Sequence, residues 1–179
     1  MKYLNQEIEN ELRNQGAELI RFVDISHLSE TQNRQFPHAI VFALPLTAGY
    51  IKEVCDTPDY VQARIDDNYN FDDDEYFITE NRTHKLADNM AAYIAEKGYN
   101  AFSQSDENLI AEGKFDAAHK ESLLPNKTIA LLAGLGWIGK NNLLITPEYG
   151  AAQCLGTVLT DAPLETVLCL SLIHISEPT

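Results

Sequence analysis

The sequence predicts an α/β fold in which a mixed sheet carries helices on both faces. Three observations indicate this class: an apolar run at residues 39–44, further strand-like runs at 18–24 and 153–160, and amphipathic segments between them. A run without polar positions is buried on both sides, as in the central strand of a layered α/β protein. The chain has 179 residues, 45% of them hydrophobic, which is enough to form a sizeable core.

The first third of the chain is predicted to begin with an amphipathic helix. Leu4, Ile8 and Leu12 share one helical face, and Gly16 is suited to ending the helix. The elements expected here are a helix at 3–15, a strand at 18–24, a polar loop with one helical turn at 26–35, the central strand at 38–45 and the start of a helix within 46–55.

A long helix is predicted in the middle of the chain. Acidic residues gather at 66–67 and 72–75, where negative charge complements the N-terminal end of a helix dipole; a metal cluster is the alternative. We expect His84 on the helix surface. The buried stripe is expected at Leu86, Met90, Tyr93 and Ile94. The segments are a helix at 73–97, a strand at 99–103, an irregular polar stretch at 105–125, a helix-like run at 127–133, a turn at 146–150 and a strand at 153–160.

Composition bounds the function. The net charge of −14 repels phosphate backbones and argues against nucleic-acid binding by this segment alone. No apolar run reaches the length of a membrane span, and acidic residues near Met1 argue against a signal peptide. Cys55, Cys154 and Cys169 are scattered without a CxxC pair, so we interpret them as reduced thiols in a cytoplasmic protein.

The stretch at 127–145 has the most unusual composition. It holds three of the nine glycines, the only tryptophan and a lysine in an otherwise apolar setting. Dense glycines allow positive φ and close approach of the backbone, and backbone N–H groups beside a lysine suit an anionic group such as phosphate. The residues concerned are Gly134, Gly136, Trp137, Gly139 and Lys140.

Two nucleotide-binding motifs match this stretch only in part. Gly134-x-Gly136-x-x-Gly139 fits the dinucleotide fingerprint, but that motif follows a strand and opens a helix, which is the reverse of the order expected here. The same glycines and Lys140 nearly form a phosphate loop, but Asn141 stands where Ser or Thr would hold magnesium. A glycine-rich turn with a solvated Lys140 is the plain structural alternative.

Two longer blocks carry a family resemblance. AGLGWIGKNNLLITPEYG occupies residues 133–150, and LGTVLTDAPL occupies 155–164. In this order and spacing, they resemble the epoxyqueuosine reductases and their shorter iron–sulfur relatives. The resemblance covers residues 127–164, and the preceding part of the chain agrees only in general layout.

The resemblance implies a cytoplasmic reductase. Its N-terminal half would have a fold related to nitroreductase-like and corrinoid-reducing proteins and would hold base-off cobalamin. It also implies two [4Fe–4S] clusters in a C-terminal half absent from this sequence, an electron donor protein, and tRNA as a partner through that half. Tyr149 would stack on the cofactor, with simple packing as the alternative. The implied cofactor-binding residues are Gly134, Gly136, Trp137, Gly139, Lys140, Asn141 and Tyr149.

The sequence also departs from the family pattern. Lys120 stands where the family has the aspartate thought to protonate the substrate, and Asp116 and Glu121 are the nearest carboxylates, so the catalytic residues are unknown. Lys127 replaces a family arginine with the same charge. We expect 1–167 to be an α/β cofactor-binding domain.

Residues 168–179 contain one cysteine instead of cluster-binding runs, and they resemble translated adapter sequence. We therefore expect this tail to be non-native and this segment alone to be inactive. Two other functions stay open: an iron–sulfur electron carrier in which this domain docks a partner, and a flavin-type reductase. The missing aspartate favours the carrier, whereas the retained glycine block favours the reductase.

Overall fold

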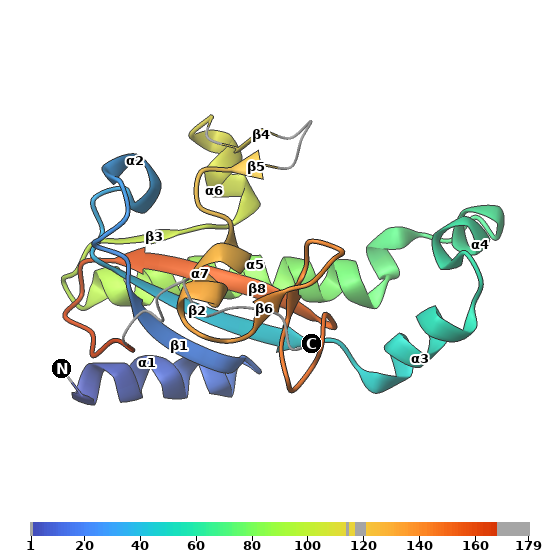
Figure 1. Ribbon diagram of the computed structural model, residues 1–179, viewed down its shortest axis with the longest axis horizontal. Helices are drawn as coiled ribbons and strands as arrows, with labels where there is room; N and C mark the ends of the chain where they lie inside the picture. The colour runs from blue at the N-terminus through green and yellow to red at the C-terminus, as the bar shows by residue number, and fades with distance from the viewer. Residues whose placement is uncertain (1, 114, 117–120, 168–179) are drawn as a thin grey trace.

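Four strands form the central sheet of the computed structural model, which describes residues 2–113, 115–116 and 121–167 (Figure 1). Neighbouring strands of this sheet pair antiparallel, and the parallel pairing found among the described residues is an isolated bridge between Val23 and Val167. The predicted α/β class is confirmed, but the sheet that was expected to be mixed is antiparallel. In spatial order, the strands are β1 (Glu18–Asp24), β2 (His38–Pro45), β8 (Gln153–Thr160) and β3 (Ala101–Ser103).

Strand β2 is the centre of the sheet, as its apolar run predicts. It pairs with β8 along its whole length, from His38 opposite Thr160 to Pro45 opposite Gln153. Residues 39–44 are buried, because helices cover both faces of the sheet. The predicted bounds of β1, β2 and β8 agree with the structure.

Helices α1 (Lys2–Asn14) and α5 (Glu75–Glu96) cover one face of the sheet. Of the predicted stripe on α5, Leu86, Met90 and Ile94 are buried, and Tyr93 is partly buried. Gly156 of β8 makes the close approach possible: a Cβ there would lie 2.4 Å from Cζ of Phe42 and 3.0 Å from Cγ2 of Thr83 on α5. A glycine at this position therefore sets how closely α5 packs on the sheet.

Helix α7 (Asn126–Leu132) covers the other face. Its Ile129 and Ala130 are fully buried, and they share a core cluster with Val41 and Leu159 of the sheet. The glycine-rich stretch follows this helix and forms a short hairpin of β6 (Trp137–Ile138) and β7 (Leu144–Ile145). Helices therefore lie on both faces, as expected.

A small helical lobe extends from the end of the sheet (Figure 1). It consists of α3 (Ala48–Asp56), α4 (Tyr60–Asp66) and the 3-10 helix η1 (Phe71–Asp73), and none of these described helices has a buried residue. The prediction missed α4 and also α6 (Asp106–Ala111), which lies in a stretch expected to be irregular. The remaining elements are α2 (Glu30–Asn33), β4 (Phe115–Asp116) and β5 (Glu121–Ser122).

The acidic stretch at 72–75 lies at the start of α5, as predicted. Asp74 is the N-cap residue, and its carboxylate accepts the backbone N–H of Tyr76 at 2.9 Å. Among the described residues, no group of three or more His, Cys, Asp or Glu side chains is arranged to hold a metal ion. Across all described residues, no helix combines the length and apolar character needed to cross a bilayer.

Replacing Gly156 with alanine should destabilise the fold by about 1–3 kcal/mol, because the new methyl group would overlap the buried ring of Phe42. Urea denaturation of wild type and Gly156→Ala measures this difference. Gly49→Ala is the matched control, since its Cβ would meet only Thr47 Oγ1 at 3.8 Å in an exposed helix. An unchanged unfolding midpoint for Gly156→Ala would contradict the proposed packing.

Candidate functional site

A cavity of about 370 Å³ opens where both helical layers meet the start of β8. Helix α5, the first turn of α7 and the tip of the β6–β7 hairpin form its walls. Its volume lies near the lower end of the range for small-molecule sites. The lining residues are Tyr76, Glu80, Thr83, His84, Asp106, Pro125, Asn126, Lys127, residues 142–144, Ala151, Gln153, Cys154 and Leu155.

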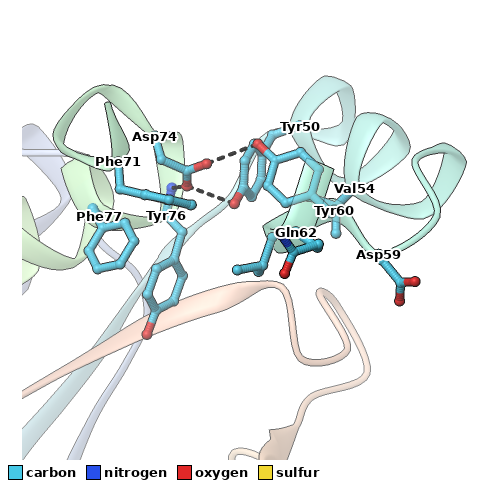
Figure 2. Close-up of a pocket in the computed structure, with 10 residues that line it drawn as sticks. Tyr50, Val54, Asp59, Tyr60, Gln62, Phe71, Asp74, Tyr76 and Phe77 are labelled. Carbon is cyan, nitrogen blue, oxygen red and sulfur yellow. Dashed lines mark hydrogen bonds between the residues drawn. The ribbon is translucent and has the colours of Figure 1, made fainter. Parts of the chain in front are cut away.

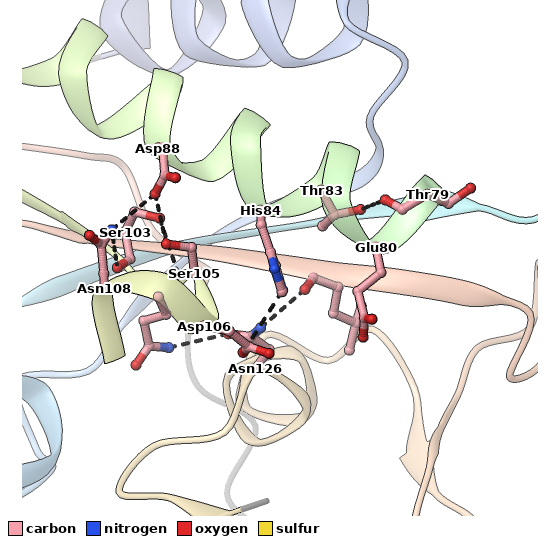
Figure 3. A network of polar contacts seen from close by, with 12 residues as sticks. Thr79, Glu80, Thr83, His84, Asp88, Ser103, Ser105, Asp106, Asn108 and Asn126 are labelled. Carbon is pink, nitrogen blue, oxygen red and sulfur yellow. Dashed lines mark hydrogen bonds and ion pairs between the residues drawn. The ribbon is translucent and has the colours of Figure 1, made fainter. Parts of the chain in front are cut away.

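One face of α5 supplies the polar wall of this cavity. Tyr76, Glu80 and His84 follow one another at intervals of four residues, so they lie on the same side of the helix. The Tyr76 hydroxyl donates to Glu80 Oε1 at 2.9 Å. His84 Nε2 lies 3.9 Å from Asp106 Oδ1, as Figure 3 shows. The side chain of His84 is only 20% exposed, which corrects the expectation of a surface histidine.

Two groups along this wall hold their protons tightly. Burial, reinforced by the charge of Glu80, raises the pKa of Tyr76 well above that of an ordinary phenol. Burial, again with Glu80, raises the pKa of the Cys154 thiol to about 12. Both groups are therefore neutral at pH 7, and Cys154 is a free thiol, as expected. Cys55 is also a free thiol, and Cys169 lies outside the described residues.

The first turn of α7 joins the cavity to the hairpin and to the sheet. Asn126 donates to the Leu155 carbonyl at 3.1 Å and accepts from Gln104 at 3.3 Å. Lys127 donates to the carbonyl of Asn142 at 3.0 Å. Lys127 therefore places a positive charge at the rim of the cavity, across from the carboxylates of α5 and α6.

Gly134 ends helix α7. Its φ is +70°, a conformation that suits glycine. The N–H of Gly134 donates to the Leu131 carbonyl and that of Leu135 to the Ala130 carbonyl, each at 3.0 Å. This pair of bonds is the Schellman motif that commonly closes a helix. The helix precedes the glycines and a strand follows them, which is the order expected from the sequence.

Gly136 and Gly139 allow the hairpin to close on itself. A Cβ on Gly136 would lie 1.9 Å from the Ile145 carbonyl oxygen, and one on Gly139 would lie 3.0 Å from Ile145 Cγ1. The N–H of Gly139 donates to Leu143 O and that of Asn142 to Gly139 O, both at 2.9 Å. These glycines thus have a demonstrable packing role, and their contact with a cofactor stays a prediction.

The other predicted cofactor residues are divided between the hairpin and a nearby turn. Trp137 is 37% exposed, and Lys140 and Asn141 are exposed at the hairpin tip, where Asn141 Oδ1 accepts the N–H of Leu143 at 3.2 Å. The Tyr149 hydroxyl donates to Glu18, and this bond raises the pKa of Tyr149. Residues 142–144 line the cavity, whereas the seven predicted residues lie outside its lining. Whether they bind a cofactor stays a prediction.

The sequence analysis missed Tyr76, Glu80, His84 and Cys154 as cavity residues. The four-residue spacing on α5 was an available signal for the first three. The carboxylates nearest to Lys120 in the sequence, Asp116 and Glu121, lie in β4 and β5, and only their backbone is described. Lys120, at the family aspartate position, lies outside the described residues.

No known family model matches the chain. Curated relatives match it in part. The epoxyqueuosine reductase of Listeria monocytogenes is 52% identical over 42 residues, which are 24% of this chain and 11% of the relative. The epoxyqueuosine reductase of Gloeobacter violaceus is 59% identical over 39 residues, which are 22% of this chain and 12% of the relative. The epoxyqueuosine reductase of Pseudomonas aeruginosa is 32% identical over 91 residues, which are 51% of this chain and 21% of the relative.

The chain resembles the epoxyqueuosine reductases. This confirms the resemblance seen in the sequence, and the match spans no more than about a fifth of the length of these curated relatives. Solved structures extend the likeness to the fold. The catabolic reductive dehalogenase NpRdhA has a TM-score of 0.66 at 15% identity, over 92% of this chain and 22% of its own. A selenomethionine-labelled epoxyqueuosine reductase has a TM-score of 0.56 at 14% identity, over 95% of this chain and 48% of its own.

The Cys154 thiol should resist alkylation in the folded chain. At pH 8 its raised pKa keeps it protonated, whereas Cys55 is exposed. Iodoacetamide followed by peptide mass mapping should therefore label Cys55 at least about tenfold faster. Labelling of Cys154 should accelerate as the pH rises toward 12, or when urea unfolds the chain. Equal labelling of both thiols at pH 8 would show that the wall beside Glu80 is open to solvent.

Proposed function

We propose that this chain is part of a reductase of the epoxyqueuosine reductase type that binds a corrinoid. The observation that carries the proposal is the position of the glycine block, whose hairpin forms the rim of the cavity beside α5. The block resembles the epoxyqueuosine reductases, and the fold resembles both these enzymes and a reductive dehalogenase. A related dehalogenase structure is described in terms of B12-dependent dehalogenation.

The residues present fit a cofactor held by side chains across the hairpin. The cavity is too small to enclose a whole corrinoid, so the ring would lie over the rim. Trp137 offers an exposed aromatic face, and Lys140 offers a cation for a phosphate or another anionic group. The backbone N–H groups of Gly134, Gly139 and Asn142 already donate within the chain and do not form a phosphate cradle.

A bound corrinoid supplies a redox-active cobalt, and the chain itself would supply the proton for reduction. Tyr76 is the residue we assign to this role. Its hydroxyl lies on the cavity wall, carries a proton and is oriented by its hydrogen bond to Glu80. This assignment would replace the family aspartate, whose position is held here by Lys120.

The remaining parts of the proposal concern regions beyond this domain. Two [4Fe–4S] clusters, an electron donor protein and a cytoplasmic location follow from the same family type. One epoxyqueuosine reductase has been solved with a modified tRNA-Tyr stem loop. Given the net charge of −14, we propose that any tRNA contact is made mainly by another part of the protein. The comparisons do not favour the electron-carrier or flavin alternative.

Lys140→Ala should weaken corrinoid binding by about tenfold, because the substitution removes a charge-assisted contact. Cobalamin titration followed by visible absorption measures this change, in the chain and in a complete protein that contains it. Lys52→Ala is the matched control, since Lys52 is an exposed lysine of α3 paired with Asp56. Absence of corrinoid absorption after reconstitution of the complete wild-type protein would refute the cofactor assignment.

Tyr76→Phe should lower turnover of the complete protein by at least about 100-fold, while corrinoid binding is unchanged. The substitution keeps the ring in place and removes the hydroxyl that we assign as proton donor. Single-turnover reduction measures the effect. His84→Gln tests the neighbouring wall residue, which lies beside Asp106. Full activity of Tyr76→Phe, with loss in His84→Gln, would move the assignment to the His84–Asp106 pair.

A further inference from the structure

A second and larger cavity, of about 850 Å³, lies on the helical lobe (Figure 2). It belongs to α3, α4, η1 and the first turn of α5, away from the glycine hairpin. Tyr76 is the residue that it shares with the smaller cavity. The lining residues are Tyr50, Val54, Asp59, Tyr60, Val61, Gln62, Phe71, Asp74, Tyr76 and Phe77.

A buried carboxylate organises the wall of this cavity. Asp74 is only 2% exposed, and it accepts hydrogen bonds from the hydroxyls of Tyr50 at 2.8 Å and Tyr60 at 2.9 Å. The two tyrosine rings contact each other edge to face, with centroids 6.0 Å apart. The helix cap, the two rings and the carboxylate therefore form one fixed unit, as Figure 2 shows.

The hydrogen-bond donors along this wall already have partners. The hydroxyl protons of Tyr50 and Tyr60 point to Asp74, and that of Tyr76 points to Glu80. Gln62 directs an N–H to Asp66 at 2.8 Å. What the tyrosines can offer a ligand is therefore oxygen lone pairs and the electron-rich faces of their rings. Such a wall favours a ligand that carries positive charge.

The charged residues that line the cavity are both acidic. Asp59 and Asp74 lie in its wall, and no lysine, arginine or histidine is among its lining residues in the described part of the chain. Arg64 of α4 pairs with Glu53, and its guanidinium carbon lies 4.9 Å from the ring centre of Tyr60 and 4.6 Å from that of Tyr69. The aromatic rings of this lobe thus already accept a cation on one side.

We propose that this cavity binds an organic cation of the alkylammonium class. The rings of Tyr50, Tyr60 and Phe71 would surround the cationic head, and Asp74 would compensate its charge through the polarised tyrosine hydroxyls. Val54 and Val61 would contact its apolar substituents. This site is separate from the hairpin, so the inference does not depend on the proposed reductase function.

Choline chloride is a suitable probe, titrated into the whole chain and followed by calorimetry or by NMR of the tyrosine rings. Its control ligand is the dimethylbutanol isomer HOCH2CH2C(CH3)3, which has the shape of choline with a neutral carbon in place of the nitrogen. Choline should bind saturably and at least about tenfold more tightly than the alcohol, because only the cation gains from the rings and the carboxylate. Equal affinities, or no saturable binding of choline, would overturn the proposal.

Asp74→Asn tests the role of the carboxylate while asparagine can still cap α5. Choline affinity should fall by about tenfold, and binding of the neutral alcohol should not change. Asp72→Asn is the matched control, because it removes the same charge from an exposed neighbour outside the cavity lining. Thermal unfolding of each variant shows whether the lobe is intact. If Asp72→Asn weakened choline binding as much as Asp74→Asn, the loss would come from the net charge of the protein, and the proposed site would be wrong.

Discussion

The antiparallel pairing of β2 with β8 organises the fold. It joins residues 38–45 to residues 153–160 along their whole length. Helix α5 can then pack on one face through Gly156, and α7 on the other face through Ile129 and Ala130. Because Gln153, Cys154 and Leu155 begin β8 and also line the smaller cavity, the register of this pair determines which side chains face that cavity.

The N-cap of α5 connects the fold to both cavities. Asp74 fixes where the helix begins, and the four-residue spacing of Tyr76, Glu80 and His84 places them on one face of it. The same carboxylate holds Tyr50 and Tyr60 from the helical lobe. One side chain thus positions the polar wall of the smaller cavity and the aromatic wall of the larger one. The acidic stretch is used for capping and for aromatic contacts.

The glycine block resembles that of the epoxyqueuosine reductases, and its glycines also have packing roles within this chain. Gly134 closes a helix, while Gly136 and Gly139 let the hairpin approach Ile145. These packing needs are sufficient to explain the glycines without a ligand. The exposed side chains beside them, Trp137 and Lys140, have no such packing explanation, and they are therefore the more informative residues for the proposed cofactor contact.

Local sequence patterns were sufficient to predict the three long strands, the first helix, the long helix and the helix-to-strand order of the glycine block. Continuous apolar runs and bounding residues such as Gly16 and Pro45 act locally, so residues 18–24, 38–45 and 153–160 could be assigned without a structure. Helices α4 and α6 have only seven and six residues, which is too short a span for hydrophobic periodicity to identify a helix. The three-dimensional arrangement was needed to reveal the antiparallel strand order, the position of His84 on a cavity wall and the two cavities. These features depend on segments far apart in the chain, such as Tyr76 and Cys154, and local patterns do not encode which distant segments will meet.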